Sequence, residues 1–156
     1  MEKLRLGILG SGRGSNYRAI QAAILRGEIH AETAIVISDL ETAGILEIAR
    51  YFQTRAEFVP PGRFRTKLEP EAEQRVTTLL TEAGVNLVVL AGYMRMIKDP
   101  LLSKYSRRII NIHPSLLPAF PGLEAWKQAL AAGVAEAGCT VHWVDQGMDS
   151  GPIIAQ

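Results

Sequence analysis

Short apolar runs alternate with segments of helical pattern along this chain, and this alternation constrains the fold more than any other feature. Apolar runs of strand length lie at residues 4–9, 33–38, 86–91 and 108–112. Strands that alternate with helices are typical of a parallel sheet with helices packed against it. We therefore expect an α/β fold with a doubly wound, mostly parallel sheet and helices on both faces.

The segments between these runs carry apolar residues three and four positions apart, as in Ile20 and Ile24. Gly27 and Gly84 follow two of these stripes and are suited to end a helix. Helices are expected over residues 16–26, 43–52, 70–83 and 124–132, with a short one opened by Asp99-Pro100. Two final strands are expected over residues 139–145 and 152–155.

Composition narrows the class of protein. A chain of 156 residues with 47% hydrophobic residues can bury the core of a single domain. The 17 basic and 16 acidic residues nearly cancel, which gives no electrostatic case for a nucleic acid or a membrane as partner. The single cysteine, Cys139, lies in an expected buried strand and fits a reducing compartment. We expect a cytoplasmic protein that acts on small molecules.

A polar pair lies at the end of the apolar run at 109–112. Asn111 and His113 are two residues apart in an extended segment, so their side chains share a face, and Pro114 then ends the strand pairing. An amide donor beside an imidazole suits the stabilisation and protonation of a developing oxyanion. Ligands of doubly wound sheets bind beyond the carboxyl ends of the strands, where this pair is expected.

A glycine-rich loop, Gly10-Ser11-Gly12-Arg13-Gly14-Ser15-Asn16, joins the first strand to the first helix. Its glycines permit close backbone approach to a ligand, and a helix N-terminus favours an anion, so phosphate is the expected occupant. No Gly-Lys-Ser/Thr follows, which excludes a Walker loop, and serine replaces the third glycine of a dinucleotide loop. A tight turn in which Ser15 or Asn16 only caps the helix is the alternative.

A second polar loop, at residues 145–151, lies between two apolar strands and carries Asp145 and Asp149. A carboxylate that reaches His113 would favour the imidazolium form and so a general acid. The alternative is that both aspartates only bond the backbone of the turn.

Other polar and aromatic residues are expected to do less. His30 is expected at the surface, His142 as a hydrogen-bonded wall residue, Asp39 as a turn or cap residue, and Trp126 in helix packing. The histidines and carboxylates lack the spacing of a zinc site, so no metal is expected.

Taken together, these segments resemble the phosphoribosylglycinamide formyltransferase family, the folate-dependent enzymes of purine synthesis. The resemblance covers essentially the whole chain. It is carried by four motifs in the family's order, namely Gly12-Arg13-Gly14-Ser15-Asn16, Leu90-Ala91-Gly92-Tyr93-Met94-Arg95, Asn111 to Pro118 with Pro121-Gly122, and Thr140-Val141-His142 with Asp149-Ser150-Gly151-Pro152-Ile153-Ile154.

The resemblance implies a Rossmann-like formyltransferase fold and transfer of a formyl group from 10-formyltetrahydrofolate, the co-substrate, to the amine of glycinamide ribonucleotide. It assigns catalysis to Asn111, His113 and Asp149, and ribonucleotide phosphate binding to Gly14, Ser15 and Asn16. The folate site that it implies comprises Arg65, Met94, Arg95, Met96, Ile97, Asn111, Asp145, Gln146, Gly147, Met148 and Asp149.

Members of the family usually continue for a further strand and helix, so we expect residues 1–156 to form one formyltransferase domain that lacks those elements. Four other functions compete with the first. Formyltetrahydrofolate deformylase replaces the amine by water, and methionyl-tRNA formyltransferase needs a surface for RNA. A nucleotide-binding oxidoreductase would use Gly10, Gly12 and Asp39, and a non-catalytic binding module is the last alternative. The glycine loop favours a small phosphorylated acceptor over water or tRNA.

Overall fold

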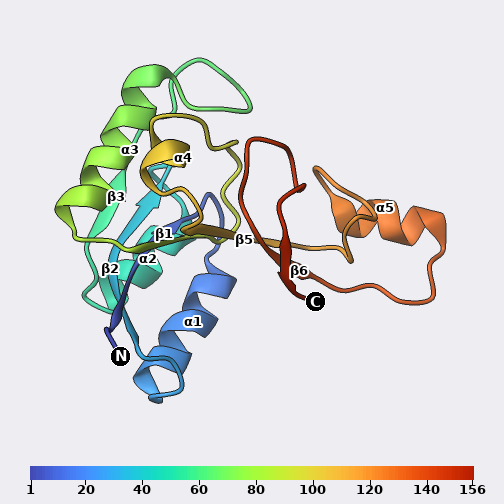
Figure 1. Cartoon of the computed structure of the whole chain (residues 1–156), viewed down its shortest axis with the longest axis horizontal. Helices are drawn as coiled ribbons and strands as arrows, with labels where there is room; N and C mark the ends of the chain where they lie inside the picture. The colour runs from blue at the N-terminus through green and yellow to red at the C-terminus, as the bar shows by residue number, and fades with distance from the viewer.

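A computed structural model describes all residues, 1–156, and contains one seven-stranded sheet with the strand order β3-β2-β1-β4-β5-β6-β7 (Figure 1). The strands are β1 (Leu4–Leu9), β2 (Ala31–Ser38), β3 (Ala56–Phe58), β4 (Leu87–Leu90), β5 (Ile109–His113), β6 (Thr140–Trp143) and β7 (Ile153–Ala155). The helices are α1 (Ser15–Leu25), α2 (Gly44–Tyr51), α3 (Pro70–Glu82), α4 (Leu101–Lys104) and α5 (Ala125–Ala132).

The sheet is parallel from β3 to β5 and antiparallel from β5 to β7. The expectation of an α/β fold with a mostly parallel sheet is therefore confirmed. The hairpin that joins β6 to β7 makes β7 antiparallel to β6, and β6 itself pairs antiparallel with β5.

Two apolar cores lie on opposite faces of the sheet, because neighbouring residues of a strand point to opposite sides. In β1, Ile8 packs with α1 and α2, whereas Leu9 packs with α3 and α4. Gly7 is required on the second face, because a Cβ there would lie 2.4 Å from Leu80 Cδ2. Helices thus cover both faces, as expected.

Three expectations about individual elements are wrong. No strand was expected at β3, because its three residues are too few to show an alternation of apolar and polar side chains. Cys139 is exposed, because β6 begins one residue later, at Thr140. Trp126 does not pack in the core: it is 59% exposed on α5, which stands apart from the other helices (Figure 1). The expected surface position of His30 is confirmed.

The carboxyl ends of β1, β4 and β5 lie at one edge of the sheet and lead into residues 10–16, 92–97 and 114–122. β6 runs the other way, so its carboxyl end lies beside the beginning of β5, where Val144 N–H donates to the Ile109 carbonyl at 2.9 Å. The loop after β6 must therefore fold back to approach the other three. None of the helices is long and apolar enough to span a membrane.

Candidate active site

The pairing of β5 with β6 sets two polar side chains opposite each other. Asn111 and His142 are register partners in the antiparallel pair, and Asn111 Nδ2 lies 3.4 Å from His142 Nε2. Directly opposite residues of neighbouring strands share a face, which explains the contact. His142 is 2% exposed and is hydrogen-bonded, as expected for a wall residue.

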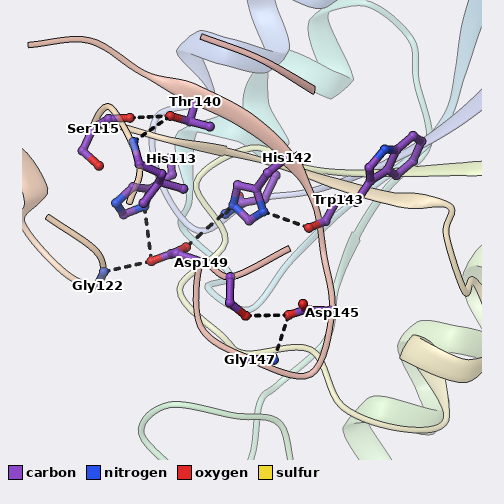
Figure 2. Close-up of polar contacts among 12 residues, drawn as sticks. His113, Ser115, Gly122, Thr140, His142, Trp143, Asp145, Gly147 and Asp149 are labelled. Carbon is purple, nitrogen blue, oxygen red and sulfur yellow. Dashed lines mark hydrogen bonds and ion pairs between the residues drawn. The ribbon is translucent and has the colours of Figure 1, made fainter. Parts of the chain in front are cut away.

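Asp149 joins this pair to His113 (Figure 2). One carboxylate oxygen, Oδ2, lies 3.5 Å from His113 Nδ1 and accepts a hydrogen bond of 2.8 Å from the Gly122 backbone N–H. The other, Oδ1, lies 3.8 Å from His142 Nε2. The structure thus gathers Asn111, His113 and Asp149 into one cluster, with His142 as its fourth member.

The outer nitrogens of both imidazoles face backbone carbonyls. His113 Nε2 lies 2.9 Å from the Phe120 oxygen, and His142 Nδ1 lies 2.9 Å from the Trp143 oxygen. A carbonyl only accepts, so each of these nitrogens carries a proton. In the neutral tautomers, the inner nitrogens, which face Asp149, then carry lone pairs and no proton. The cluster thus places a carboxylate between two imidazoles, beside an amide.

The two aspartates of the loop have different partners. Asp145 Oδ1 accepts from Gly147 N–H at 2.9 Å and from Ser150 Oγ–H at 2.8 Å, so it stabilises its own turn. Asp149 has a left-handed backbone, with φ of 53°, and its side chain points away from this turn toward the histidines. The turn-residue alternative therefore describes Asp145 and not Asp149.

Thr140 shapes the segment that follows β5. Its hydroxyl donates to the Ser115 carbonyl at 2.7 Å and accepts from Leu117 N–H at 3.1 Å. Both bonds are buried, and they hold the chain after His113 against β6. This brings Phe120 and Gly122 back over the histidine and aspartate that they contact. The sequence does not predict the contact of His113 with the Phe120 carbonyl or that of Asp149 with Gly122 N–H, because nearly every residue type has these backbone groups.

The glycine loop ends at Gly14, the N-cap of α1, with φ of 83° and no side-chain cap. A Cβ at Gly14 would lie 2.8 Å from Ile45 Cα, so only glycine fits. Ser15 and Asn16 are exposed and make no capping bond, contrary to the alternative in which they only cap the helix. The first turn contains no acidic residue, which leaves its N–H groups and positive dipole available to an anion.

A cavity of about 740 Å³ lies between α4 and the loop after β6, within the size range of small-molecule sites. Leu102 and Val144 contribute apolar surface, and Asp145 and Gln146 contribute polar groups. Asn111, His113 and Asp149 do not line it. The loop links the two features, because its first residues line the cavity and Asp149 near its end belongs to the cluster.

The residues expected to bind folate after β4 are placed unequally. Met94 is 58% exposed and Met96 is half-buried, whereas Ile97 is 4% exposed and packs in the core. The side chain of Arg95 is 14% exposed and is already engaged, since its Nε donates to Asp39 Oδ2 at 2.8 Å. Arg65 is exposed, and only its backbone carbonyl takes part, as an acceptor from Arg95 Nη1 at 2.8 Å.

Asp39 is not the turn or cap residue that its position after β2 suggested. It is 3% exposed, pairs with Arg95 and accepts from the Ser11 hydroxyl. Its burial leaves almost no surface for the ribose hydroxyls of a dinucleotide. The sequence signal for this role was weak, because the partners of Asp39 lie 28 and 56 residues away along the chain.

The profile of the family described as formyl transferase matches residues 4–156. The phosphoribosylglycinamide formyltransferase of Bacillus subtilis (strain 168) is 45% identical over 152 residues, which are 97% of this chain and 77% of the relative.

Solved structures agree. Glycinamide ribonucleotide transformylase 1 of Symbiobacterium toebii superposes with a TM-score of 0.93 at 47% identity, covering 99% of this chain and 72% of the other. A formyltetrahydrofolate deformylase from Pseudomonas syringae gives a TM-score of 0.87 at 29% identity, covering 98% and 50%. Trifunctional purine biosynthetic proteins of animals also match, and the chain spans between 11% and 15% of their length.

Proposed function

The chain belongs to the formyl transferase family, and from this premise we propose that it transfers the formyl group of 10-formyltetrahydrofolate to the amine of glycinamide ribonucleotide, in purine synthesis. The observation that carries the proposal is the cluster around Asp149, which combines an amide donor, two imidazoles and a carboxylate. Such a set can stabilise an oxyanion and move a proton, the two tasks that formyl transfer requires.

The proposed reaction is a direct attack without a covalent enzyme intermediate. The amine nitrogen of the ribonucleotide forms a bond to the formyl carbon, and the formyl oxygen becomes an oxyanion. The bond from that carbon to N10 of the folate then breaks, and one proton passes from the attacking amine to the leaving nitrogen. Cys139, the only thiol, is exposed and lies outside the cluster, so it is not proposed as a nucleophile.

Asn111 and His113 are proposed to stabilise the oxyanion. One N–H of the Asn111 amide faces His142, and the other is proposed to donate to the formyl oxygen. His113 Nε2–H donates to the Phe120 carbonyl, and we propose that the formyl oxygen replaces this carbonyl as acceptor. Each such donor is worth ~2.7–4 kcal/mol of barrier in acyl transfer.

Asp149 is proposed to relay the proton, assisted by the two histidines. Its distances of 3.5 Å to His113 and 3.8 Å to His142 are longer than strong hydrogen bonds. Because Gly122 N–H holds Oδ2, Oδ1 is the oxygen proposed to face the attacking amine or a water molecule. His142, fixed by the Trp143 carbonyl, is proposed to position Asn111 and Asp149 rather than to contact the substrates.

Two further sites are proposed to hold the substrates. The N-terminus of α1, at Gly14, Ser15 and Asn16, would bind the phosphate of the ribonucleotide, since its first turn lacks acidic residues and a side-chain cap. The folate would lie between Met94–Ile97 and the loop from Asp145 to Asp149, with the adjoining cavity available to its ring system. Holding both substrates supplies the remaining rate by proximity.

Hydrolysis of formyltetrahydrofolate is the second candidate, because a deformylase is 29% identical over 98% of this chain. In that reaction water would take the place of the amine at the same cluster. The glycine loop favours transfer, since a site for phosphate has no evident use when the acceptor is water.

The test is consumption of 10-formyltetrahydrofolate by the protein with and without glycinamide ribonucleotide. Transfer predicts turnover only when the amine is present. A rate that is equal in its absence would establish hydrolysis instead, and no turnover in either case would overturn both proposals. Glycinamide ribonucleoside without phosphate serves as a matched acceptor and should raise KM strongly, because it cannot use the N-terminus of α1.

A further inference from the structure

Three segments that are distant in the sequence meet at the carboxyl of Asp39, at the end of β2. Its Oδ1 accepts from the hydroxyl of Ser11 in the glycine loop, and its Oδ2 accepts from Arg95 Nε at 2.8 Å. Ser11 Oγ in turn accepts from Met94 N–H at 2.9 Å. One carboxylate thus links the loop proposed for phosphate to the segment proposed for folate.

Arg95 extends this link to a fourth segment. Its Nη1 donates to the Phe64 and Arg65 carbonyls, at 2.7 and 2.8 Å. The same segment pairs with the chain after β4 through Met96 N–H, which donates to the Thr66 carbonyl at 2.7 Å. The guanidinium therefore holds the segment at 64–65 against the segment after β4 through its own hydrogen bonds.

The hydrogen-bond network of Ser11, Asp39 and Arg95 is largely buried. Ser11 and Asp39 are 6% and 3% exposed, and the Arg95 side chain is 14% exposed. The Ser11 hydroxyl both donates and accepts, and each oxygen of Asp39 has a partner. Ser11 and Asp39 therefore offer almost no surface to a substrate, and their effect on the reaction passes through the segments that they hold.

We infer that Ser11, Asp39 and Arg95 are positioning residues that fix the phosphate loop and the folate segment relative to each other. The inference rests on the proposed function and deepens it, because it assigns the spacing of the two substrates to one buried charge pair. Fixing both substrates matters for bimolecular transfer, since small misplacements of reacting groups are costly. In this assignment the guanidinium of Arg95 acts by holding these segments together.

The test compares Asp39→Asn and Ser11→Ala with Ser38→Ala in the whole chain. Asp39→Asn keeps the size of the side chain and removes its charge. Ser38 is a suitable control, because it is a buried serine at the end of β2, next to Asp39. Its hydroxyl accepts only from Leu40 N–H, at 3.1 Å. Two properties are measured, namely KM for each substrate and amide hydrogen exchange of the ligand-free protein.

We expect both test variants to raise KM for the ribonucleotide and for the folate together, by about 5-fold or more, as the loss of one hydrogen bond predicts. In Asp39→Asn, exchange should quicken at three amides on two segments: Met94 and Met96 after β4, and Ile45 in α2, whose N–H groups bond Ser11, Thr66 and Gly12. Ser38→Ala should change neither property by more than 2-fold.

Two results would overturn the inference. One is a rise in KM for a single substrate, and the other is an equal rise in Ser38→Ala. If the wild-type protein turns over no formyl group, the proposed function fails while the exchange data still decide the inference. Faster exchange at Met94 alone would then reduce Ser11 and Asp39 to a local contact.

Discussion

His113 Nδ1 and Asp149 Oδ2 face each other at 3.5 Å, although the two residues are 36 positions apart in the sequence. His113 ends β5, whereas Asp149 lies in the loop between β6 and β7. The contact exists because the loop after β6 folds back over β5 and presents a carboxylate to the imidazole. Gly122 N–H holds the carboxylate from the other side, at 2.8 Å.

Asp149→Asn should lower kcat by ~10²–10⁴-fold, since an amide cannot carry the proton that general acid–base catalysis requires. The variant should fold normally, because the amide oxygen can still accept from Gly122 N–H. Steady-state kinetics together with thermal unfolding measure both effects. Glu124→Gln is the control, as its carboxylate is exposed and pairs only with Lys127. Wild-type turnover in a folded Asp149→Asn would remove Asp149 from the chemistry.

Asn111→Ala should lower kcat by ~10²–10³-fold through the loss of one oxyanion donor. Its effect on KM should be small, because the donor acts most strongly when negative charge develops in the transition state. Asn86→Ala is a matched control, since that side chain accepts from Arg5 N–H far from the cluster and should affect stability alone. An increase in KM with unchanged kcat would show that Asn111 binds the ground state instead.

Gly14→Ala should destabilise the protein and raise KM for glycinamide ribonucleotide. The new Cβ would lie 2.8 Å from Ile45 Cα at a φ of 83°, so the phosphate loop must move. Gly12→Ala has no atom within 4 Å of its added Cβ and should unfold at the wild-type temperature. Thermal unfolding of the two variants is the measurement. Equal unfolding temperatures would mean that the loop yields without cost.

Stability should depend on pH through Glu73, which is 2% exposed on α3. Burial raises the pKa of this carboxyl from 4.5 to about 7, although the hydrogen bond that it accepts from Lys98 N–H lowers the pKa in part. The proton is held more tightly in the folded state. Its stabilising effect is complete below the unfolded pKa and is lost as pH rises through about 7.

Glu73→Gln should therefore flatten the stability profile and stabilise the protein at pH 8, by an amount of order 3 kcal/mol at most. Urea unfolding at pH 5, 6, 7 and 8 measures it. Glu71→Gln, an exposed change on the same helix, should leave the profile as in the wild type. A wild-type profile that rises between pH 5 and 8 with no change in Glu73→Gln would contradict the account.

Local patterns predicted much of the fold. The apolar run before Asn111 and His113 placed β5 within one residue at either end, because a buried strand of a parallel sheet is recognisable from its own side chains. The Gly14-Ser15-Asn16 motif likewise marked the start of α1. In these places the local preference of the chain and its tertiary environment agree, so the sequence is sufficient.

The remaining features depend on contacts between distant residues. The antiparallel pairing of β6 with β5 is not encoded within Thr140–Trp143. The pair of Asp39 with Arg95 bridges 56 residues, and an aspartate after a strand looks the same whether it caps a turn or is buried. Trp126 shows the converse, since its helical spacing does not reveal whether another element covers it.

The fate of a labelled formyl carbon tests the central claim most directly. The protein is incubated with 10-[13C]formyltetrahydrofolate and glycinamide ribonucleotide, and the products are followed by NMR. The account predicts that the label is found in the formylated amine, with one tetrahydrofolate released for each label transferred. Label recovered as free formate, at a rate independent of the amine, would contradict it.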